Sequence, residues 1–247
     1  MNKIKNAIDS FSREIKSGPT ADLHLLRAKS YAVLGDVHHA LEDIRRAIEL
    51  EPDHKEAYDD LALAHLKNGD FSAAEKAAEK AHSINPHIAA VNWMVAREGN
   101  RLTRKISDAP TAALHNKRGL LSLYQGALIP AKADFEAAVK MDREFDDAYA
   151  NLAQTLLKLA LPQEAEKVLD DISDRHPAFK HDNILLAKKW AFLELKVNHS
   201  PTAETYKDLA KICVEQETIQ AWEKAQLYYD KARELDEAAI APLVKMY

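Results

Sequence analysis

The side chains with the clearest metal-binding chemistry in this chain are its eleven histidines. A zinc site on a helix needs ligands that face one ion, such as two histidines four residues apart or histidines combined with cysteines. The adjacent residues His38 and His39 lack that spacing, because neighbours on a helix point in different directions. The single cysteine, Cys213, adds no thiolate set. The sequence therefore predicts no metal site and no cofactor.

Motifs for catalysis are also missing from the sequence. It contains no glycine-rich loop of the phosphate-binding type and no strand–turn–helix motif of the hydrolase type. Its acidic residues stand near lysines at helical spacing, which is typical of solvated helix surfaces. We therefore predict a protein that is not an enzyme and has no catalytic residue.

The composition of 47% hydrophobic and 30% charged residues indicates a soluble, globular protein. The single cysteine cannot form an internal disulfide, which indicates a reducing compartment. The net charge of −5 is spread along the chain, which argues against non-specific binding to nucleic acid. No apolar run approaches the roughly 20 residues of a membrane-spanning helix. Near the N-terminus, Ile4, Ile8 and Phe11 are separated by charged residues, which indicates an amphipathic helix and not a signal peptide. We therefore expect a cytoplasmic protein that enters no membrane.

A period of 34 residues runs through the chain and sets its architecture. Gly35-Asp36 returns as Gly69-Asp70, and this spacing is kept by three further pairs, Ala40 with Ala74, Ala47 with Ala81, and Pro52 with Pro86. The frame appears again at Gly126, Ala131, Phe135 and Ala138, and then at Tyr149, Leu152, Ala165 and Pro177. Apolar residues keep helical spacing, and no stretch alternates as a strand would. Such a period is typical of helical repeat proteins.

This pattern resembles the tetratricopeptide repeat (TPR), a helix–turn–helix unit of 34 residues. Four repeats fit residues 21–54, 55–86, 112–145 and 146–177, and a fifth begins at Ala203. The resemblance implies an all-α fold, a TPR-type helical-repeat superhelix (α-solenoid). It also places Gly35, Gly69 and Gly126 in the turn between the two helices of a repeat.

A second period of 91 residues groups the repeats into modules, because Pro-Thr-Ala begins at Pro19, Pro110 and Pro201. Each full period holds two repeats and an extra segment, and Leu102 and Leu193 keep the extra segments in register. We expect these segments to be single helices, although Gly99-Asn100 leaves open a break in the first. The predicted parts are an N-terminal helix at 1–18, a repeat pair with an extra helix at 19–109 and again at 110–200, and a terminal repeat with a cap at 201–247.

Two arginines replace apolar residues of the repeat core. Arg27 and Arg118 stand where the other two complete repeats have leucine. The same two repeats carry Asp43 and Asp134 sixteen residues later, where the others have an alanine and a valine. This correlated exchange predicts that the side chains meet between the helices of one repeat, since a lone buried charge is too costly. We predict the structural ion pairs Arg27–Asp43 and Arg118–Asp134.

The resemblance also implies a binding surface, because the first helices of TPR repeats line a concave groove that holds peptides or helices of partner proteins. The frame positions that face this groove carry leucines, lysines and a few polar residues. The partner-binding residues implied here are Leu25, Lys29, Asp60, Leu63, Lys67, Asn116, Lys117, Leu120, Tyr124, Asn151, Gln154, Lys158, Lys207 and Lys211. The lysines suit acidic groups of a ligand, and the leucines suit an apolar anchor.

The family resemblance implies a non-catalytic protein–protein interaction adaptor. Family members that bind chaperone tails use a clamp of lysine, asparagine and arginine residues, and this chain has Leu25 and Asp60 at two of the clamp positions. That subtype is therefore disfavoured. Two alternatives stay open: some groove residues contact the extra helices or a second copy, and the chain is a self-assembling scaffold whose repeats mediate homo-oligomerisation.

Overall fold

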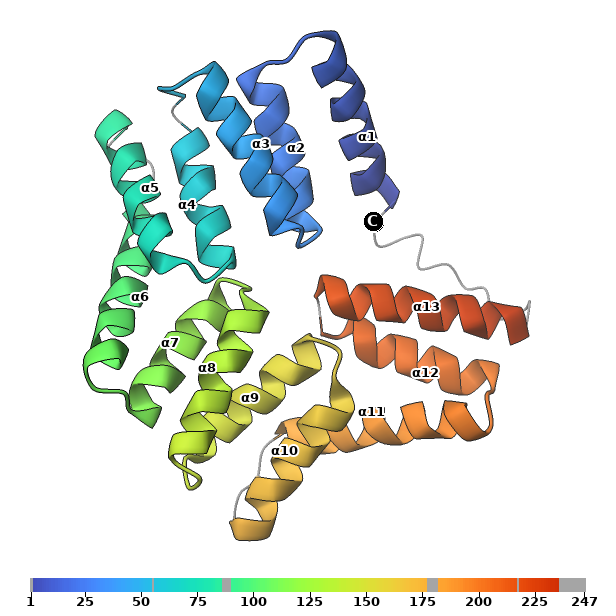
Figure 1. The fold of residues 1–247 in the computed structure, drawn as a ribbon. Coiled ribbons are helices and arrows are strands. Elements are labelled where there is room, and N and C mark those ends of the chain that lie inside the picture. The colour runs from blue at the N-terminus through green and yellow to red at the C-terminus, as the bar shows by residue number, and fades with distance from the viewer. Residues whose placement is uncertain (1, 55, 86–89, 177–181, 217, 236–247) are drawn as a thin grey trace. The chain divides into compact units, whose positions relative to one another are not determined.

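The computed structural model describes residues 2–54, 56–85, 90–176, 182–216 and 218–235, and every regular element in them is an α-helix (Figure 1). The predicted all-α fold is therefore confirmed. None of the described helices is long and apolar enough to span a bilayer. The first seven helices are α1 Asn2–Ser17, α2 Ala21–Val33, α3 Val37–Leu50, α4 Ala57–Lys67, α5 Phe71–Ile84, α6 Ala90–Asp108 and α7 Ala112–Tyr124. They are followed by α8 Leu128–Met141, α9 Asp146–Lys158, α10 Pro162–Arg175, α11 Asp182–His199, α12 Ala203–Val214 and α13 Ile219–Leu235.

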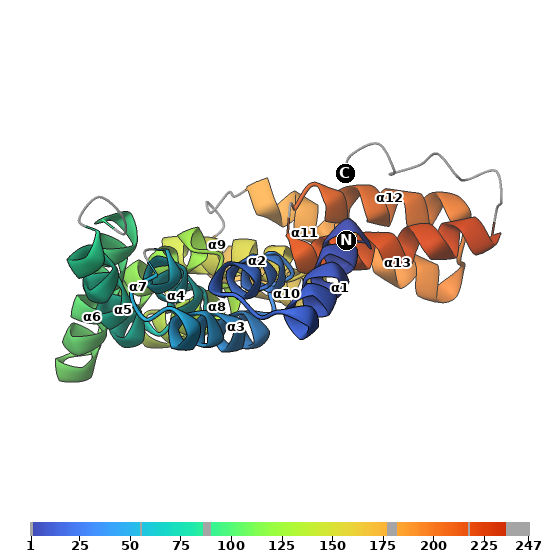
Figure 2. The ribbon, with the colours of Figure 1, turned by 90° about the horizontal axis from the view of Figure 1, so that it is seen from above.

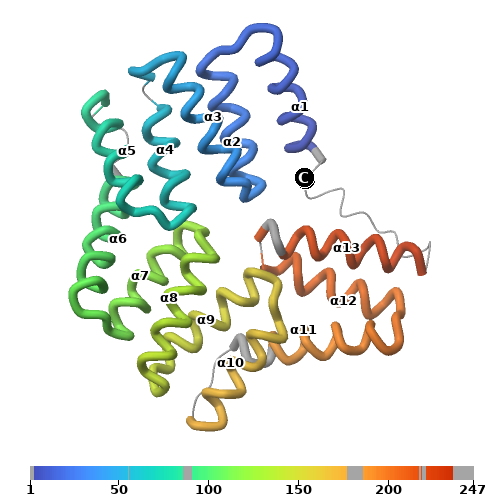
Figure 3. The backbone as a smooth tube through the Cα atoms, viewed as in Figure 1, coloured from blue at the N-terminus to red at the C-terminus, as the bar shows by residue number. Residues whose placement is uncertain are grey.

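The helices form pairs that match the predicted repeats. The pairs are α2 with α3, α4 with α5, α7 with α8, α9 with α10 and α12 with α13, while α1, α6 and α11 are the additional helices. From α1 to α7 each helix contacts the next, and α2 also contacts α4 (Figure 3). In the view from above, α2 and α4 lie on one side of this part and α3 and α5 on the other (Figure 2).

Threonines start the helix that opens each 91-residue period. The hydroxyl groups of Thr20, Thr111 and Thr202 accept hydrogen bonds from backbone N–H groups three residues later, at 3.3, 3.2 and 3.2 Å. Such a bond satisfies one of the N–H groups that a helix leaves unpaired at its N-terminus. The long period therefore marks equivalent starts of α2, α7 and α12.

Left-handed residues end the first helix of the repeats. Gly35, Gly69 and Gly126 have φ values of 76°, 76° and 73°, and Ala160 takes the same role with a φ of 58°. An alanine pays a steric cost in that region. The Ala160 carbonyl oxygen accepts a hydrogen bond from Lys224 Nζ at 3.0 Å, and the Lys158 carbonyl accepts one from Thr218 Oγ1 at 2.6 Å. The end of α9 is thus satisfied by side chains at and just before α13.

The extra segments are single helices, as expected. Helix α6 continues through Gly99 and Asn100 without a break. A Cβ atom at Gly99 would lie 2.1 Å from Cδ1 of Phe71, so the glycine lets α6 approach α5 closely. Leu102 of α6 and Leu193 of α11 are both buried, which supports the predicted register between the two helices.

The chain divides into two compact units, residues 1–134 and 135–247, and the division falls inside α8. It cuts the third repeat, whereas the parts predicted from sequence end at 18, 109 and 200. The four parts predicted from sequence group segments that resemble one another along the chain, and this division stays a prediction.

Small residues bring α2, α3 and α4 close together in the first unit. Their buried cluster combines alanines of all three helices with Leu25, Leu41 and Ile44. Alanine side chains allow short distances between helix axes, so the larger apolar residues become fully covered. Leu25, which the family frame assigns to the groove, is only 3% exposed and belongs to this core.

Candidate binding groove

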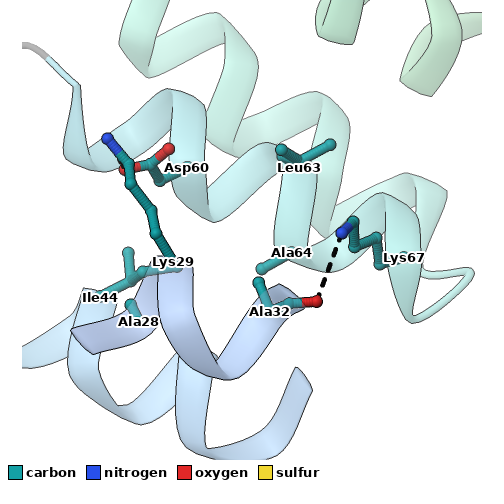
Figure 4. A pocket seen from close by; sticks show the side chains of 8 residues that line it. All are labelled: Ala28, Lys29, Ala32, Ile44, Asp60, Leu63, Ala64 and Lys67. Carbon is teal, nitrogen blue, oxygen red and sulfur yellow. Dashed lines mark hydrogen bonds and ion pairs between the residues drawn. The ribbon is translucent and has the colours of Figure 1, made fainter. Parts of the chain in front are cut away.

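A small pocket lies between α2 and α4, which are the first helices of the first two repeats, and Figure 4 shows the residues that line it. Its volume is about 40 Å³, which is enough for a small apolar group or a water molecule. The lining residues are Ala28, Lys29, Ala32, Ile44, Asp60, Leu63, Ala64 and Lys67. Four of the predicted groove residues, Lys29, Asp60, Leu63 and Lys67, thus surround one pocket with an apolar floor.

One end of the pocket is an ion-pair cluster. Lys29 Nζ lies 3.3 Å from both Glu56 Oε2 and Asp60 Oδ2. The Asp60 side chain is only 18% exposed, and its Oδ2 atom makes no well-directed hydrogen bond. Burial, together with the nearby charges of Asp59 and Glu56, raises the pKa of Asp60 although Lys29 acts in the opposite direction. Burial lowers the pKa of Lys29, but Asp60 and Glu56 together raise it above its usual value.

The other end of the pocket carries a lysine without a carboxylate partner. Lys67 Nζ donates to the carbonyl oxygen of Ala32 at 3.5 Å, the dashed line in Figure 4. This distance is at the long limit for a hydrogen bond. Lys67 forms no ion pair within the described part of the chain, whereas Lys29 has two acidic neighbours. The positive charge at this end is therefore the one less compensated.

The additional helix α6 covers part of the same helix face. Asn92 Nδ2 donates to Asp59 Oδ1 at 2.8 Å, and the Trp93 ring stacks on His82 with 6.0 Å between ring centroids. Trp93 also packs against the buried cluster of Ala62, Ala77, Ala78 and Ala81. The beginning of α4 is thus in contact with α6, while the pocket farther along α4 stays open.

Comparison with known proteins gives the family. Two family models described as tetratricopeptide repeat match residues 25–87 and 123–186. The chain belongs to the tetratricopeptide repeat family. It is similar to the Hsp70-Hsp90 organizing protein of Triticum aestivum, with 33% identity over 87 residues, 34% of this chain and 15% of that protein. It is also similar to the SGT1 homolog of Oryza sativa subsp. japonica, with 26% identity over 150 residues, 60% of this chain and 36% of that protein.

Similarity to solved structures extends over most of the TPR chain. The TPR domain of P58(IPK) has 18% identity and a TM-score of 0.42, over 96% of this chain and 88% of that chain. The TPR2AB domain of yeast Sti1, solved as a pHSP90 complex, has 17% identity and a TM-score of 0.39, over 93% of this chain and 92% of that chain. By contrast, the chain spans 10%, 15% and 36% of the first three curated relatives, the first being the bacteriophage adsorption protein A of Escherichia coli (strain K12).

Other groove positions of the first unit differ in accessibility. Leu25 and Asn116 are buried, and Leu120 is half-buried. Tyr124 is 83% exposed at the end of α7, and Lys117 Nζ pairs with Glu98 Oε1 at 3.2 Å. The surface available to a partner in this unit is therefore smaller than the family frame implies.

The second unit carries the remaining groove positions. Gln154 is exposed, and Asn151 and Lys158 are half-buried. Lys207 Nζ lies 3.7 Å from Glu204 Oε2, and Lys211 Nζ lies 3.2 Å from Asp208 Oδ1. Acidic residues of α12 therefore partly neutralise both lysines.

Both predicted arginine–aspartate pairs are present in the structure. Arg27 donates from Nε and Nη2 to the two oxygens of Asp43, at 2.8 and 2.7 Å. Arg118 makes the same two bonds to Asp134, also at 2.8 and 2.7 Å. The Asp43 side chain is 5% exposed, but the Arg27 side chain is 21% exposed, so the arginine is not fully desolvated.

A histidine joins each of these arginine–aspartate pairs, and it was not predicted from the sequence. His24 Nδ1 lies 2.8 Å from Asp43 Oδ1, and His115 Nδ1 lies 2.9 Å from Asp134 Oδ1. Each histidine stands three residues before its arginine, close to one helical turn, so both side chains reach the same carboxylate. That shared spacing of three residues, in two repeats, is the signal that could have revealed them.

The adjacent histidines His38 and His39, which were rejected as metal ligands from the sequence, lie closer together in the structure than their spacing suggested. His38, His39 and Glu42 each offer an atom within 4.8 Å of the others, and all three side chains are exposed. His39 Nδ1 also lies 2.6 Å from Asp36 Oδ2, next to the cap of α3. The argument that neighbouring histidines cannot approach one ion is therefore too strict here.

Proposed function

We propose that this TPR chain is a non-catalytic interaction module that binds a segment of a partner protein on the first-helix face of its first unit. The observation that carries this proposal is the pocket between α2 and α4, with its apolar floor and a lysine at each end. Relatives that share the family include a protein solved with a bound partner, which supports protein binding as the general role.

The shape of the pocket indicates what such a segment presents. About 40 Å³ is suited to a small apolar side chain. Because Glu56 and Asp60 already neutralise Lys29, an acidic group of the ligand is expected at Lys67. Leu63 lies between these ends and supplies apolar contact area (Figure 4).

Selection of peptides from a random display library against the whole chain tests this proposal. We expect enriched peptides to combine a small apolar residue with an acidic neighbour. Ala32→Leu, which fills the pocket from its half-buried rim, should weaken their binding by about tenfold or more. The matched control is Ala113→Leu, at an exposed alanine of α7 outside the pocket. Equal binding by the two variants would show that the pocket is not used.

Self-assembly is the second candidate, and exposed apolar residues favour it. Leu26 and Val33 on α2 and Ile129 on α8 are exposed in the structure. Light scattering during size-exclusion chromatography, over a range of protein concentration, separates the candidates. A mass that rises with concentration and falls in the variant Val33→Glu would favour the scaffold.

A further inference from the structure

The outer face of α11 combines two exposed apolar side chains with positive charges. Phe192 is 64% exposed and Leu195 is 58% exposed. Lys188 and His199 lie on the same stripe, because spacings of four, three and four residues follow one face of a helix. Lys196 flanks the stripe and is exposed as well. Trp190, Leu193 and Val197 are buried, so α11 already has a packed face on another side.

This face can be compared with two other helices of the same chain, because the 91-residue period aligns α1 and α6 with α11. The positions of Phe192 and Leu195 correspond, 91 residues earlier, to Arg101 and Arg104 of α6. A further 91 residues earlier they correspond to Ser10 and Arg13 of α1. Two of the three aligned helices thus have charged or polar residues at these two positions. Packing of an additional helix therefore does not require apolar residues at the positions of Phe192 and Leu195.

Charge on this face is positive and only partly compensated. Lys188 Nζ lies 2.8 Å from Asp170 Oδ1 of α10. Lys189 and Lys196 make no ion pair within the described residues. Glu194, an acidic residue of α11, is turned inward and contacts Lys224 Nζ at 2.5 Å. The apolar centre therefore has a positive border, and no carboxylate from residues 186–199 of α11, whose side chains the structure describes, lies on it.

We propose that this face of α11 docks an acidic amphipathic helix of a partner protein. Apolar residues of that helix would cover Phe192 and Leu195, while its carboxylates would meet Lys189 and Lys196. A symmetric contact between two copies is disfavoured, because it would bring the same lysines together. A flat anionic membrane is disfavoured by α10, whose carboxylate Asp170 lies beside Lys188 at the edge of the face.

The proposal is tested with a fluorescein-labelled synthetic helix that carries leucines on one face and glutamates at its borders. Fluorescence anisotropy measures its binding to the full chain. The double variant Phe192→Ser with Leu195→Ser removes the apolar centre without adding charge. Since α1 has Ser10 at the place of Phe192, the variant is expected to fold, and far-UV circular dichroism checks this. We expect its affinity to fall by about tenfold or more, and the same for Lys189→Glu with Lys196→Glu. Ile129→Arg, at an exposed apolar residue of α8, should leave binding unchanged.

Three results would overturn the proposal. The first is that the chain and the serine double variant bind the acidic helix equally, or that neither binds it. The second is binding to vesicles of phosphatidylserine and phosphatidylcholine that the double variant loses while the helix does not bind. The third is a change of oligomeric state in the double variant, which would make a second copy the occupant.

Discussion

Arg27 and Arg118 each donate a hydrogen bond from Nη1 to a hydroxyl group on the helix that precedes their own. The acceptors are Ser12 Oγ of α1 at 2.9 Å and Thr103 Oγ1 of α6 at 3.1 Å. Because each arginine also binds an aspartate of the following helix, one guanidinium joins three helices. The additional helices α1 and α6 are thereby each joined to the repeat that follows them in the sequence.

Removal of one partner from this network should destabilise the first unit. Asp43→Ala leaves Arg27 and His24 without their acceptor. Since the Arg27 side chain is 21% exposed, part of the charge reaches solvent. We therefore expect a loss of about 2–3 kcal/mol, below the cost for a fully buried pair. Urea unfolding followed by circular dichroism measures it.

The second repeat suggests the compensating change. It has Tyr58, Leu61 and Ala77 at the positions of His24, Arg27 and Asp43. The triple variant His24→Tyr, Arg27→Leu and Asp43→Ala should recover most of the lost stability, because no charged group of the network is left unpaired. A single Asp43→Ala variant as stable as the original chain would show that the network contributes little.

The contact between Gly99 and Phe71 predicts a sharp difference between two glycines. A Cβ at Gly99 would lie 2.1 Å from the buried Phe71 ring, whereas nothing lies within 4 Å of one at Gly18. Gly99→Ala should cost about 1–3 kcal/mol through overpacking. Gly18→Ala should change stability by less than about 0.5 kcal/mol. Similar unfolding midpoints for the two variants would contradict the close approach of α6 to α5.

The buried carboxylate of Glu194 should make the second unit sensitive to acid. Burial raises its pKa, but hydrogen bonds from Lys224, Tyr228 and Gln163 outweigh burial and place the pKa below the usual value. Its stabilisation is therefore complete above the pKa of the unfolded chain, near 4.5, and is lost as the pH falls through the lower folded value.

Comparison with Glu194→Gln isolates this effect. As the pH falls from 4.5 through the lower folded pKa of Glu194, the original chain should lose more stability than the variant, because only the original has this carboxylate to protonate. Hydrogen exchange of α13 amides reports the unit concerned, since Tyr228 OH donates to Glu194 Oε1 at 2.6 Å. Parallel pH profiles for the two proteins would argue against the bonded carboxylate.

Two histidines should titrate on opposite sides of the usual value of 6.5. Hydrogen bonds to Asp146 and Glu144 raise the pKa of His176, whereas burial, with Arg45, lowers the pKa of His65. Below pH 6.5 protonated His176 therefore favours folding, an effect lost as the pH rises through its folded pKa. His65 acts in reverse, because below pH 6.5 the unfolded chain binds its proton more readily.

Nuclear magnetic resonance of the imidazole groups measures both values. Asp146→Asn should lower the pKa of His176 and leave that of His65 unchanged. Identical titration curves for the two rings would contradict the contacts of His176.

Much of the fold follows from spacing in the sequence, and the parts that do not follow have physical reasons. The period of 34 predicts the helix pairs because every copy buries the same face. The ion pairs were visible because two repeats changed both partners together. Ser12 and Thr103 are also 91 residues apart, but this spacing alone did not point to the arginines, since a hydroxyl group is compatible with many surroundings.

The candidate site was less predictable than the fold. Leu25 occupies a groove position of the family, yet the alanines of α2, α3 and α4 bring these helices together and cover it. The left-handed conformation of Ala160 was not predicted, because alanine, unlike glycine, does not favour a positive φ. The exposure of a groove side chain depends on how closely neighbouring helices approach each other. The pattern of residue types in the sequence predicts that distance only in part.

The bonds from Thr218 and Lys224 to the end of α9 join residues 60 and 64 positions apart, in a fold built mainly from neighbouring contacts. During synthesis the fourth repeat would leave the ribosome well before these donors exist. Its first helix would then keep a frayed end until the terminal repeat folds. We therefore expect this end of the molecule to gain its native rigidity late and in one concerted step, while the earlier repeats consolidate one after another.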